Sequence, residues 1–284
     1  MKAARRATPV DAVIVGMGWT GSIMALELAR AGLKVVALER GRLQDTDPDF
    51  NNISRNDELR FNARTEMGQD LSRETFTFRN NGQQTALPMR QMGTTVLGTN
   101  VGGMGAHWSG ETYRNALWDF EPRSATLRRY GRTAWPADAT TEDWPLSYAE
   151  LEPHYDRFEY LAGVSGLAGA NPFEAPRSRP YPNPPLQESH AGKLFREATT
   201  RMGYHPFVAP AALASQGYEN PEGAVLGPCV YCGMCSRWGC EMGAKASPQT
   251  TLLAALRKQK SFSCARMRMC SRSMWTNARG ARPA

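Results

Sequence analysis

The chain has 284 residues, 41% of them hydrophobic, and a formal net charge of +7. This length allows one large domain or two smaller ones, and no apolar run reaches the roughly 18 residues of a membrane-spanning helix. The last acidic residue is Glu241; nine Lys and Arg side chains follow it, so the first 241 residues hold 25 basic and 27 acidic side chains. The basic character therefore belongs to the tail and gives no reason to expect nucleic-acid binding.

The first elements predict a dinucleotide-binding βαβ unit. Residues 11–15 form a short β-branched run, which is typical of a buried parallel strand, and Leu33–Leu38 is a second such run that ends on Glu39. Between them, residues 23, 26, 28 and 31 have helical apolar spacing, and Gly32 follows where a helix would end.

Three glycines join the first strand to the helix in the order that a bound pyrophosphate requires. Gly16 permits the tight turn, Gly18 lets the backbone approach the phosphates, and Gly21 lets the helix pack on the strands. The helix N-terminus supplies amides for the phosphates, and Glu39 is placed to accept hydrogen bonds from a ribose diol. The alternative is an ordinary glycine-bearing turn. Against it, the strand, the glycines, the helix, the second strand and the terminal acid follow one another in the order that a dinucleotide-binding unit requires.

The middle of the chain contains shorter signals. Glu74–Phe78 alternates polar and apolar residues, which indicates a strand before a turn at 80–82, and Ser147 with Glu150 forms a capping box for a following helix. Six prolines between residues 171 and 187 predict an extended connector, and Ser189 begins another helix. We therefore expect a dinucleotide-binding domain at 8–165, a connector at 166–188 and a helical, cysteine-containing segment at 189–260.

A glycine-rich segment at residues 93–110 is a second candidate contact with a ligand. Five glycines within residues 98–110 disfavour a regular helix or strand interior, and several apolar residues accompany them. A flexible surface loop is the alternative, but it would not need those apolar side chains, so we favour a ligand-contacting loop. His107 lies within it, either as a hydrogen-bonded structural residue or as a reactive one.

Four cysteines occur within twelve residues in the spacing C-x2-C-x2-C-x4-C: Cys229, Cys232, Cys235 and Cys240. Disulfides are disfavoured at such close spacing in a chain without a secretory signal. Thiolates on a compact loop suit an iron–sulfur cluster or, less well, zinc, because zinc ribbons separate their two CxxC pairs by a longer gap. Buried structural thiols are the remaining alternative.

Together these motifs resemble the glucose–methanol–choline (GMC) family of FAD-dependent oxidoreductases, and within it the large flavoprotein subunits of bacterial gluconate, sorbitol, fructose and glucose dehydrogenases. The similarity covers residues 10 to about 260. It rests on the glycine turn with Glu39-Arg40-Gly41, the Gly102-Gly103…His107-Trp108 loop, and the segment from Cys229 to Ser247.

The resemblance implies an α/β fold, a Rossmann-like FAD-binding domain that is truncated before a C-terminal substrate domain. It implies FAD rather than NAD in the glycine turn, with the glycine loop lying along the isoalloxazine and His107 as a candidate for covalent flavin attachment. The residues expected to bind the cofactor are Gly16, Gly18, Trp19, Thr20, Gly21, Glu39, Arg40, Gly98, Asn100, Gly102, Gly103 and His107.

The family's chemistry is hydride transfer from an alcohol carbon to flavin, assisted by a histidine base near the C-terminus of a longer chain. That base is absent from this sequence, so we name no catalytic residue and expect this chain alone to lack turnover. The segment 261–284 lacks acids and aliphatic periodicity. We expect it to be a disordered or frameshifted tail; a basic arm that binds anionic partners is the alternative.

By resemblance, the substrate is a sugar, polyol or sugar acid, and the partners are a small subunit and a cytochrome c subunit that receives electrons through the iron–sulfur cluster. The basic N-terminus is not followed by a signal-peptide core. The resemblance therefore implies export with a signal-bearing partner to the periplasmic face of the inner membrane, and otherwise a cytoplasmic location. The alternatives are an NAD-dependent reductase with a zinc or structural cysteine loop, and a truncated product without function.

Overall fold

The computed structural model describes residues 9–44, 46, 49–51, 53–54, 67–68, 76–79, 82–89 and 97–266. The predictions for residues 93–96 and for most of the tail lie outside them. The chain divides into two compact units. Unit 1 comprises Met1–Ser109, Glu222–Ala224 and Val230–Ala284; unit 2 comprises Gly110–Pro221 and Val225–Cys229. Residues 110–165, which the sequence placed in the dinucleotide-binding domain, thus belong to unit 2.

Unit 1 is built on a parallel sheet of three strands, β1 (Ala12–Val15), β2 (Val35–Glu39) and β7 (Phe262–Arg266), in the order β1-β2-β7. Ala12 pairs with Val35, and Val35 pairs with Phe262 on its other side. Besides helix α1 (Trp19–Arg30), the other described elements of the unit are β3 (Phe76–Phe78), β4 (Leu87–Met89), the 3-10 helix η2 (Gly103–Ala106), α5 (Pro248–Thr251) and α6 (Leu253–Lys258). β3 lies within the predicted strand Glu74–Phe78 and pairs antiparallel with β4.

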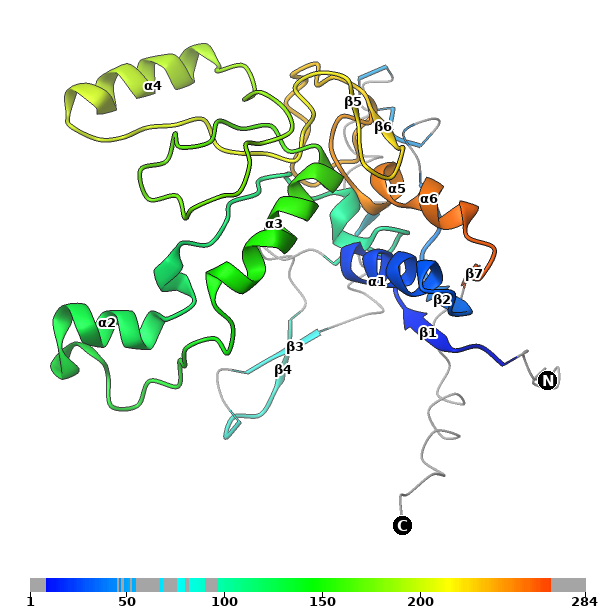
Figure 1. The fold of residues 1–284 in the computed structure, drawn as a ribbon, viewed down its shortest axis with the longest axis horizontal. Helices are drawn as coiled ribbons and strands as arrows, with labels where there is room; N and C mark the ends of the chain where they lie inside the picture. Colours follow the sequence, from blue (N-terminus) through cyan, green and yellow to red (C-terminus); the bar gives the residue numbers. More distant parts are fainter. Residues whose placement is uncertain are drawn as a thin grey trace. The chain divides into compact units, whose positions relative to one another are not determined.

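Helix α1 (Trp19–Arg30) connects β1 to β2 and packs on both strands and on α6 (Figure 1). It ends before Gly32, which has a φ of +86°, as a helix C-terminus favours. The predicted apolar face was wrong for this helix: of the four predicted positions only Leu26 is buried, together with Ser22, Ala25 and Ala29. Small residues on the buried face let the helix lie close to the sheet.

Two expectations for the sheet fail. β1 is not a buried strand, because Val13 is 54% and Val15 is 83% exposed, whereas β2 has alternate residues fully covered. The predicted disorder from residue 261 is wrong for Phe262–Arg266, which form β7 and pair in parallel with β2 along its whole length. Residues 262–266 have no apolar periodicity, because Ser263 and Arg266 interrupt it; the strand forms through backbone pairing with β2.

Unit 2 contains the 3-10 helices η3 (Leu117–Asp119) and η4 (Arg132–Ala134), the helices α2 (Pro122–Tyr130), α3 (Tyr148–Ala162) and α4 (His190–Arg201), and the short strands β5 (Tyr218–Glu219) and β6 (Val225–Leu226). The capping box is confirmed: Ser147 Oγ accepts from Glu150 N, and the Glu150 carboxylate accepts from Ser147 N at 2.8 Å. α3 continues through Pro153 as one helix.

The proline-rich segment is part of unit 2, and not a loose connector. Asn183 lies at its centre and is 1% exposed. Its backbone N–H donates to Val164 O at 3.2 Å, and its side-chain amide donates to Gly163 O at 2.9 Å. These bonds fix the segment to the residues that follow α3.

Candidate cofactor site

The turn between β1 and α1 has the geometry that its glycines predict. Gly16 has a φ of +91°, which L-residues other than glycine rarely adopt. A Cβ on Gly21 would lie 2.1 Å from Gly16 O and 3.2 Å from the Ile14 side chain, so this position has no space for a side chain. Gly16 provides the turn, and Gly21 lets the first turn of α1 lie against it.

Glu39 closes the turn from the second strand. It is 5% exposed, and its carboxylate accepts hydrogen bonds from Met17 N at 2.8 Å and from Gly41 N at 2.7 Å. The acid therefore ties the end of β2 to the glycine turn, a structural role that the sequence did not indicate. Its predicted contact with a ribose diol stays a prediction.

The glycine-rich segment lies directly beside this turn. Gly102 N donates to Met17 O at 2.9 Å, and Val101 N donates to Arg42 O at 3.0 Å. A Cβ on Gly41 would lie 2.1 Å from Thr99 O, so the two backbones touch. Segments 58 to 85 positions apart in sequence are thus brought together, as the sequence interpretation requires.

The predicted cofactor-binding residues lie on three segments of unit 1. These are Gly16, Gly18, Trp19, Thr20 and Gly21 at the start of α1, Glu39 and Arg40 at the end of β2, and Gly98, Asn100, Gly102, Gly103 and His107 in the glycine segment. Hydrogen bonds link the three segments through Met17, Glu39 and Gly102. The structure therefore gathers all three segments around one turn.

His107 ends η2 and is 5% exposed. Burial lowers the pKa of His107 below its ordinary value of 6.5, and the positive charges of Lys245 and Arg237 lower it further. Its Nε2 is buried and has no hydrogen-bond partner in the described part of the chain. The imidazole is therefore held neutral at neutral pH, the form that keeps a nitrogen lone pair.

Lys245 joins this loop to the cysteine segment, and the sequence interpretation missed it. The side chain is 1% exposed, and its Nζ donates to the backbone oxygens of Trp108, Cys235 and Trp238 at 2.7, 2.6 and 2.6 Å. Burial lowers the pKa of Lys245 to about 8, against the opposing electrostatic effect of Cys240, Cys235 and Cys232. Below that pH the ammonium supplies all three hydrogen bonds.

Trp108, the residue after His107, is held by further contacts. Its indole Nε1 donates to Ala246 O at 2.8 Å, and its ring meets that of Trp19 edge-to-face with the centroids 5.8 Å apart. The backbone of His107 accepts from Arg237 N at 2.7 Å. The cysteine segment thus supports the glycine loop through backbone contacts.

The four cysteines of the predicted metal site form no disulfide with one another: Cys229, Cys232, Cys235 and Cys240. In the described ranges, no three His, Cys, Asp or Glu side chains come together in a group that could hold a metal ion. The iron–sulfur cluster predicted from the spacing of these cysteines therefore stays a prediction.

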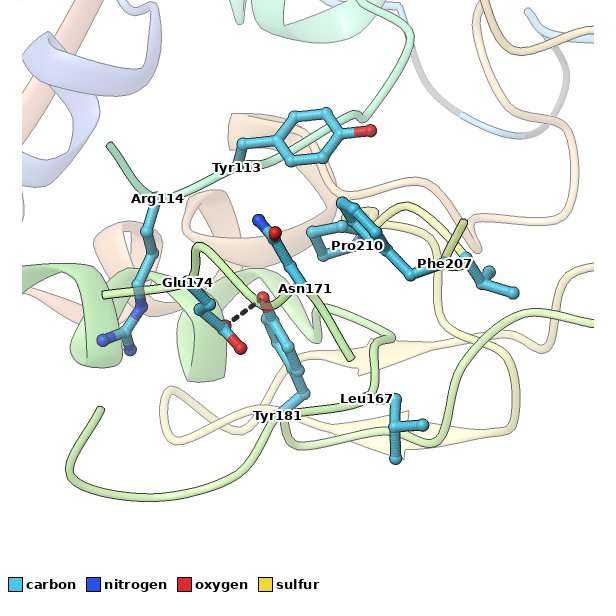
Figure 2. Close-up of a pocket in the computed structure, with 9 residues that line it drawn as sticks. Tyr113, Arg114, Leu167, Asn171, Glu174, Tyr181, Phe207 and Pro210 are labelled. Atoms are coloured by element: carbon cyan, nitrogen blue, oxygen red, sulfur yellow. Dashed lines mark hydrogen bonds between the residues drawn. The ribbon is translucent and has the colours of Figure 1, made fainter. Parts of the chain in front are cut away.

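Unit 2 has a buried charge network of its own, and Figure 2 shows Arg114, Glu174 and Tyr181 of this network beside a small cavity. The Arg114 guanidinium donates two hydrogen bonds to the Glu159 carboxylate, each at 2.8 Å, and a third to Glu152 at 2.8 Å. Tyr181 donates to Glu174 at 3.1 Å, and the Arg177 guanidinium lies 3.8 Å from the centre of the Tyr181 ring. The adjoining cavity of about 20 Å³ is the size of a single water, so the network is a structural one.

Comparison with known proteins identifies the family. No family model matches the chain. It is 43% identical over 265 residues to the gluconate 2-dehydrogenase flavoprotein of Pantoea cypripedii, which covers 89% of this chain and 43% of that protein. The chain belongs to the GMC family of FAD-dependent oxidoreductases.

Two further proteins are also similar to this chain. The large subunit of fructose dehydrogenase from Gluconobacter japonicus is 27% identical over 216 residues, 74% of this GMC chain and 38% of that protein. The crystal structure of pyridoxine 4-oxidase from Mesorbium loti matches with 18% identity and a TM-score of 0.44, over 91% of this chain and 42% of that one. The chain thus spans less than half the length of these proteins.

Membership in the GMC family confirms the predicted fold class and FAD as the expected cofactor. The residues around the glycine loop fit such a group. Asn100 and Gln249 are buried, and both amide atoms of each lack a hydrogen-bond partner within the described ranges. Unpaired buried amides cost free energy unless a ligand completes their hydrogen bonds, and FAD carries hydroxyl, phosphate and imide groups that do so.

Proposed function

We propose that this chain forms the FAD-binding part of a GMC oxidoreductase that oxidises CH–OH groups of sugars, polyols or sugar acids. The observation that carries the proposal is the docking of the glycine loop on the turn between β1 and α1, through Gly102 N and Met17 O. The 43% identity to a gluconate 2-dehydrogenase flavoprotein supports the substrate class. Bound FAD would supply the acceptor for the hydride that leaves the alcohol carbon.

In this proposal, the residues of the chain bind and orient the cofactor. Amides at the start of α1 hold the pyrophosphate, and Glu39 meets the ribose while it keeps the turn closed. Lys245 and Trp108 hold the loop that faces the isoalloxazine. The predictions for Thr20, Arg40, Gly98 and Gly103 are part of the same proposal.

The direct test is retention of FAD by the purified 284-residue chain. We expect the chain, incubated with FAD and passed through a desalting column, to carry close to one flavin per chain, visible in its absorption spectrum. A chain that is folded by circular dichroism but elutes without flavin contradicts the proposal. Retention of NAD in place of FAD would favour the alternative of a reductase.

We further propose that His107 is the site of covalent flavin attachment. Its buried, neutral imidazole with an unbonded Nε2 supports this role. Acid precipitation of the holoprotein tests it: we expect flavin in the pellet for the wild type and in the supernatant for His107→Asn. Flavin entirely in the wild-type supernatant rules the bond out.

The whole protein is proposed to work in a complex with a small subunit and a cytochrome, on the periplasmic face of the inner membrane. The name of the fructose dehydrogenase large subunit supports a multi-subunit assembly. None of the described helices is long and apolar enough to cross a membrane. Osmotic-shock fractionation of the source cells followed by native electrophoresis tests both points; a monomer in the cytoplasmic fraction contradicts them.

Electron transfer through an iron–sulfur cluster at Cys229, Cys232, Cys235 and Cys240 is a further part of the proposal, supported by the spacing of these cysteines. In the described ranges their side chains do not form a group of three or more ligands. Iron analysis of the purified chain tests the cluster, and we expect stoichiometric iron with acid-labile sulfide. Iron well below one atom per chain contradicts it.

A further inference from the structure

Gln249 is a buried residue to which the sequence interpretation gave no role. It is the second residue of α5 and is 9% exposed. Its Oε1 and Nε2 are both buried without a hydrogen-bond partner in the part of the chain that the structure describes. A buried polar atom without a hydrogen-bond partner costs free energy, so a ligand that pairs both atoms would stabilise this arrangement.

The backbone around Gln249 fixes where its side chain lies. Ser247 caps α5, its Oγ accepting from Thr250 N at 3.2 Å, and Pro248 occupies the first helical position. Because proline restricts its own backbone angle, the start of this short helix is rigid. The backbone therefore holds the Cα–Cβ bond of Gln249 in one fixed direction from the start of α5.

That direction is toward the glycine loop. A Cβ built on Gly102 would lie 2.2 Å from Gln249 Oε1 and 3.0 Å from its Nε2. The carboxamide thus occupies the space that the absent side chain of Gly102 leaves. Gly102 is the residue that binds Met17 in the turn between β1 and α1, so the carboxamide lies where the loop meets that turn.

We propose that the Gln249 carboxamide hydrogen-bonds the ribityl chain of FAD; this inference rests on the proposed FAD site. A carboxamide has two kinds of unpaired atom, a donor N–H and an acceptor C=O. A pyrophosphate offers only acceptors and would leave the Gln249 oxygen unpaired. Ribityl hydroxyls donate and accept, so they satisfy both atoms at once.

The test compares FAD with ADP on wild type and on Gln249→Met, which matches the side chain in length and removes both polar atoms. ADP carries the adenosine and the pyrophosphate but no ribityl chain. We expect the dissociation constant for FAD to rise about tenfold, as loss of hydrogen bonds to a ligand predicts, and that for ADP to stay within a factor of two. Titration calorimetry on the full chain measures both.

A second readout separates ligand contact from a structural role. Because the substitution removes unpaired polar atoms, we expect the thermal midpoint without ligand to stay constant or rise. The matched control is Gln259→Met, since Gln259 bonds its own helix through Nε2 to Ala255 O. This control should leave both dissociation constants unchanged.

Three outcomes overturn the inference: unchanged affinity for FAD, an equal loss for ADP, or a lower midpoint without ligand. An equal loss for ADP would place the carboxamide on the pyrophosphate. A wild-type chain that binds neither FAD nor ADP contradicts the proposed function itself, and so is distinct from failure of the role of Gln249.

Discussion

The Nζ of Lys245 lies 2.7 Å from the backbone oxygen of Trp108, a residue 137 positions earlier in the chain. The same ammonium binds two carbonyls of the cysteine segment, at Cys235 and Trp238. One buried side chain thus organises the loop after η2 and the segment before α5. The cysteine segment therefore supports the glycine loop.

Replacement of Lys245 by Met should separate these two segments. The change leaves three buried carbonyls without a donor, so we expect the free energy of unfolding to fall by about 3 kcal/mol or more, and FAD affinity to fall with it. Urea denaturation measures the first quantity. The exposed Lys258→Met on α6 is the control and should change stability by less than about 0.5 kcal/mol. Equal stabilities for the two variants would contradict the support role.

Gly21→Ala tests the contact of α1 with the turn. The added Cβ would lie 2.1 Å from Gly16 O, a backbone atom that cannot rotate away. We expect a loss of about 1–3 kcal/mol in stability and a weaker affinity for FAD, because α1 must move off the turn. Gly82→Ala, where a Cβ meets nothing within 4 Å, should leave both unchanged. FAD titration that finds wild-type affinity in Gly21→Ala would show that the turn tolerates displacement.

Glu39→Gln tests the carboxylate that closes the turn. Glutamine retains one acceptor and places an N–H against one of the two amides, of Met17 or Gly41, that Glu39 now binds. We expect a loss of about 1–3 kcal/mol even without ligand. Glu197→Gln on the exposed part of α4 is the matched control. If stability stays at the wild-type value while FAD affinity falls, Glu39 acts on the ribose alone.

His107 should make the fold sensitive to acid. Its pKa is lowered in the folded chain, so between that pKa and 6.5 the unfolded chain binds more protons than the folded one. Stability therefore falls as the pH drops below about 6.5, by up to roughly 1.4 kcal/mol per pH unit. Urea denaturation at about pH 5 and pH 7.5 should show a larger loss for wild type than for His107→Asn. Equal losses would mean that His107 takes up a proton without cost.

The sequence anticipated the parts of the site that depend on local chemistry. Gly16 adopts the positive φ that its turn requires, and Gly32 follows α1 with a left-handed φ. In each case a residue type has few allowed conformations, so the pattern indicates the structure directly.

The sequence could not anticipate contacts that need the folded chain. Lys245 looks like a surface residue by type, and only three converging carbonyls explain its burial. The strand at Phe262–Arg266 has no apolar alternation and forms because β2 offers it a free edge. The buried face of α1 differs from the prediction because Ala25 and Ala29 allow closer packing than larger residues would.

The most direct test of the central claim is the thermal midpoint of the full 284-residue chain with and without FAD, and with NAD as the comparison ligand. A ligand that binds the folded state alone must raise the midpoint. At a concentration one hundred times its dissociation constant, it adds about 2.7 kcal/mol to the free energy of unfolding. We predict a rise with FAD and none with NAD. A midpoint that FAD leaves unchanged, or that NAD raises equally, would contradict the assignment of this βαβ unit and its glycine loop to FAD.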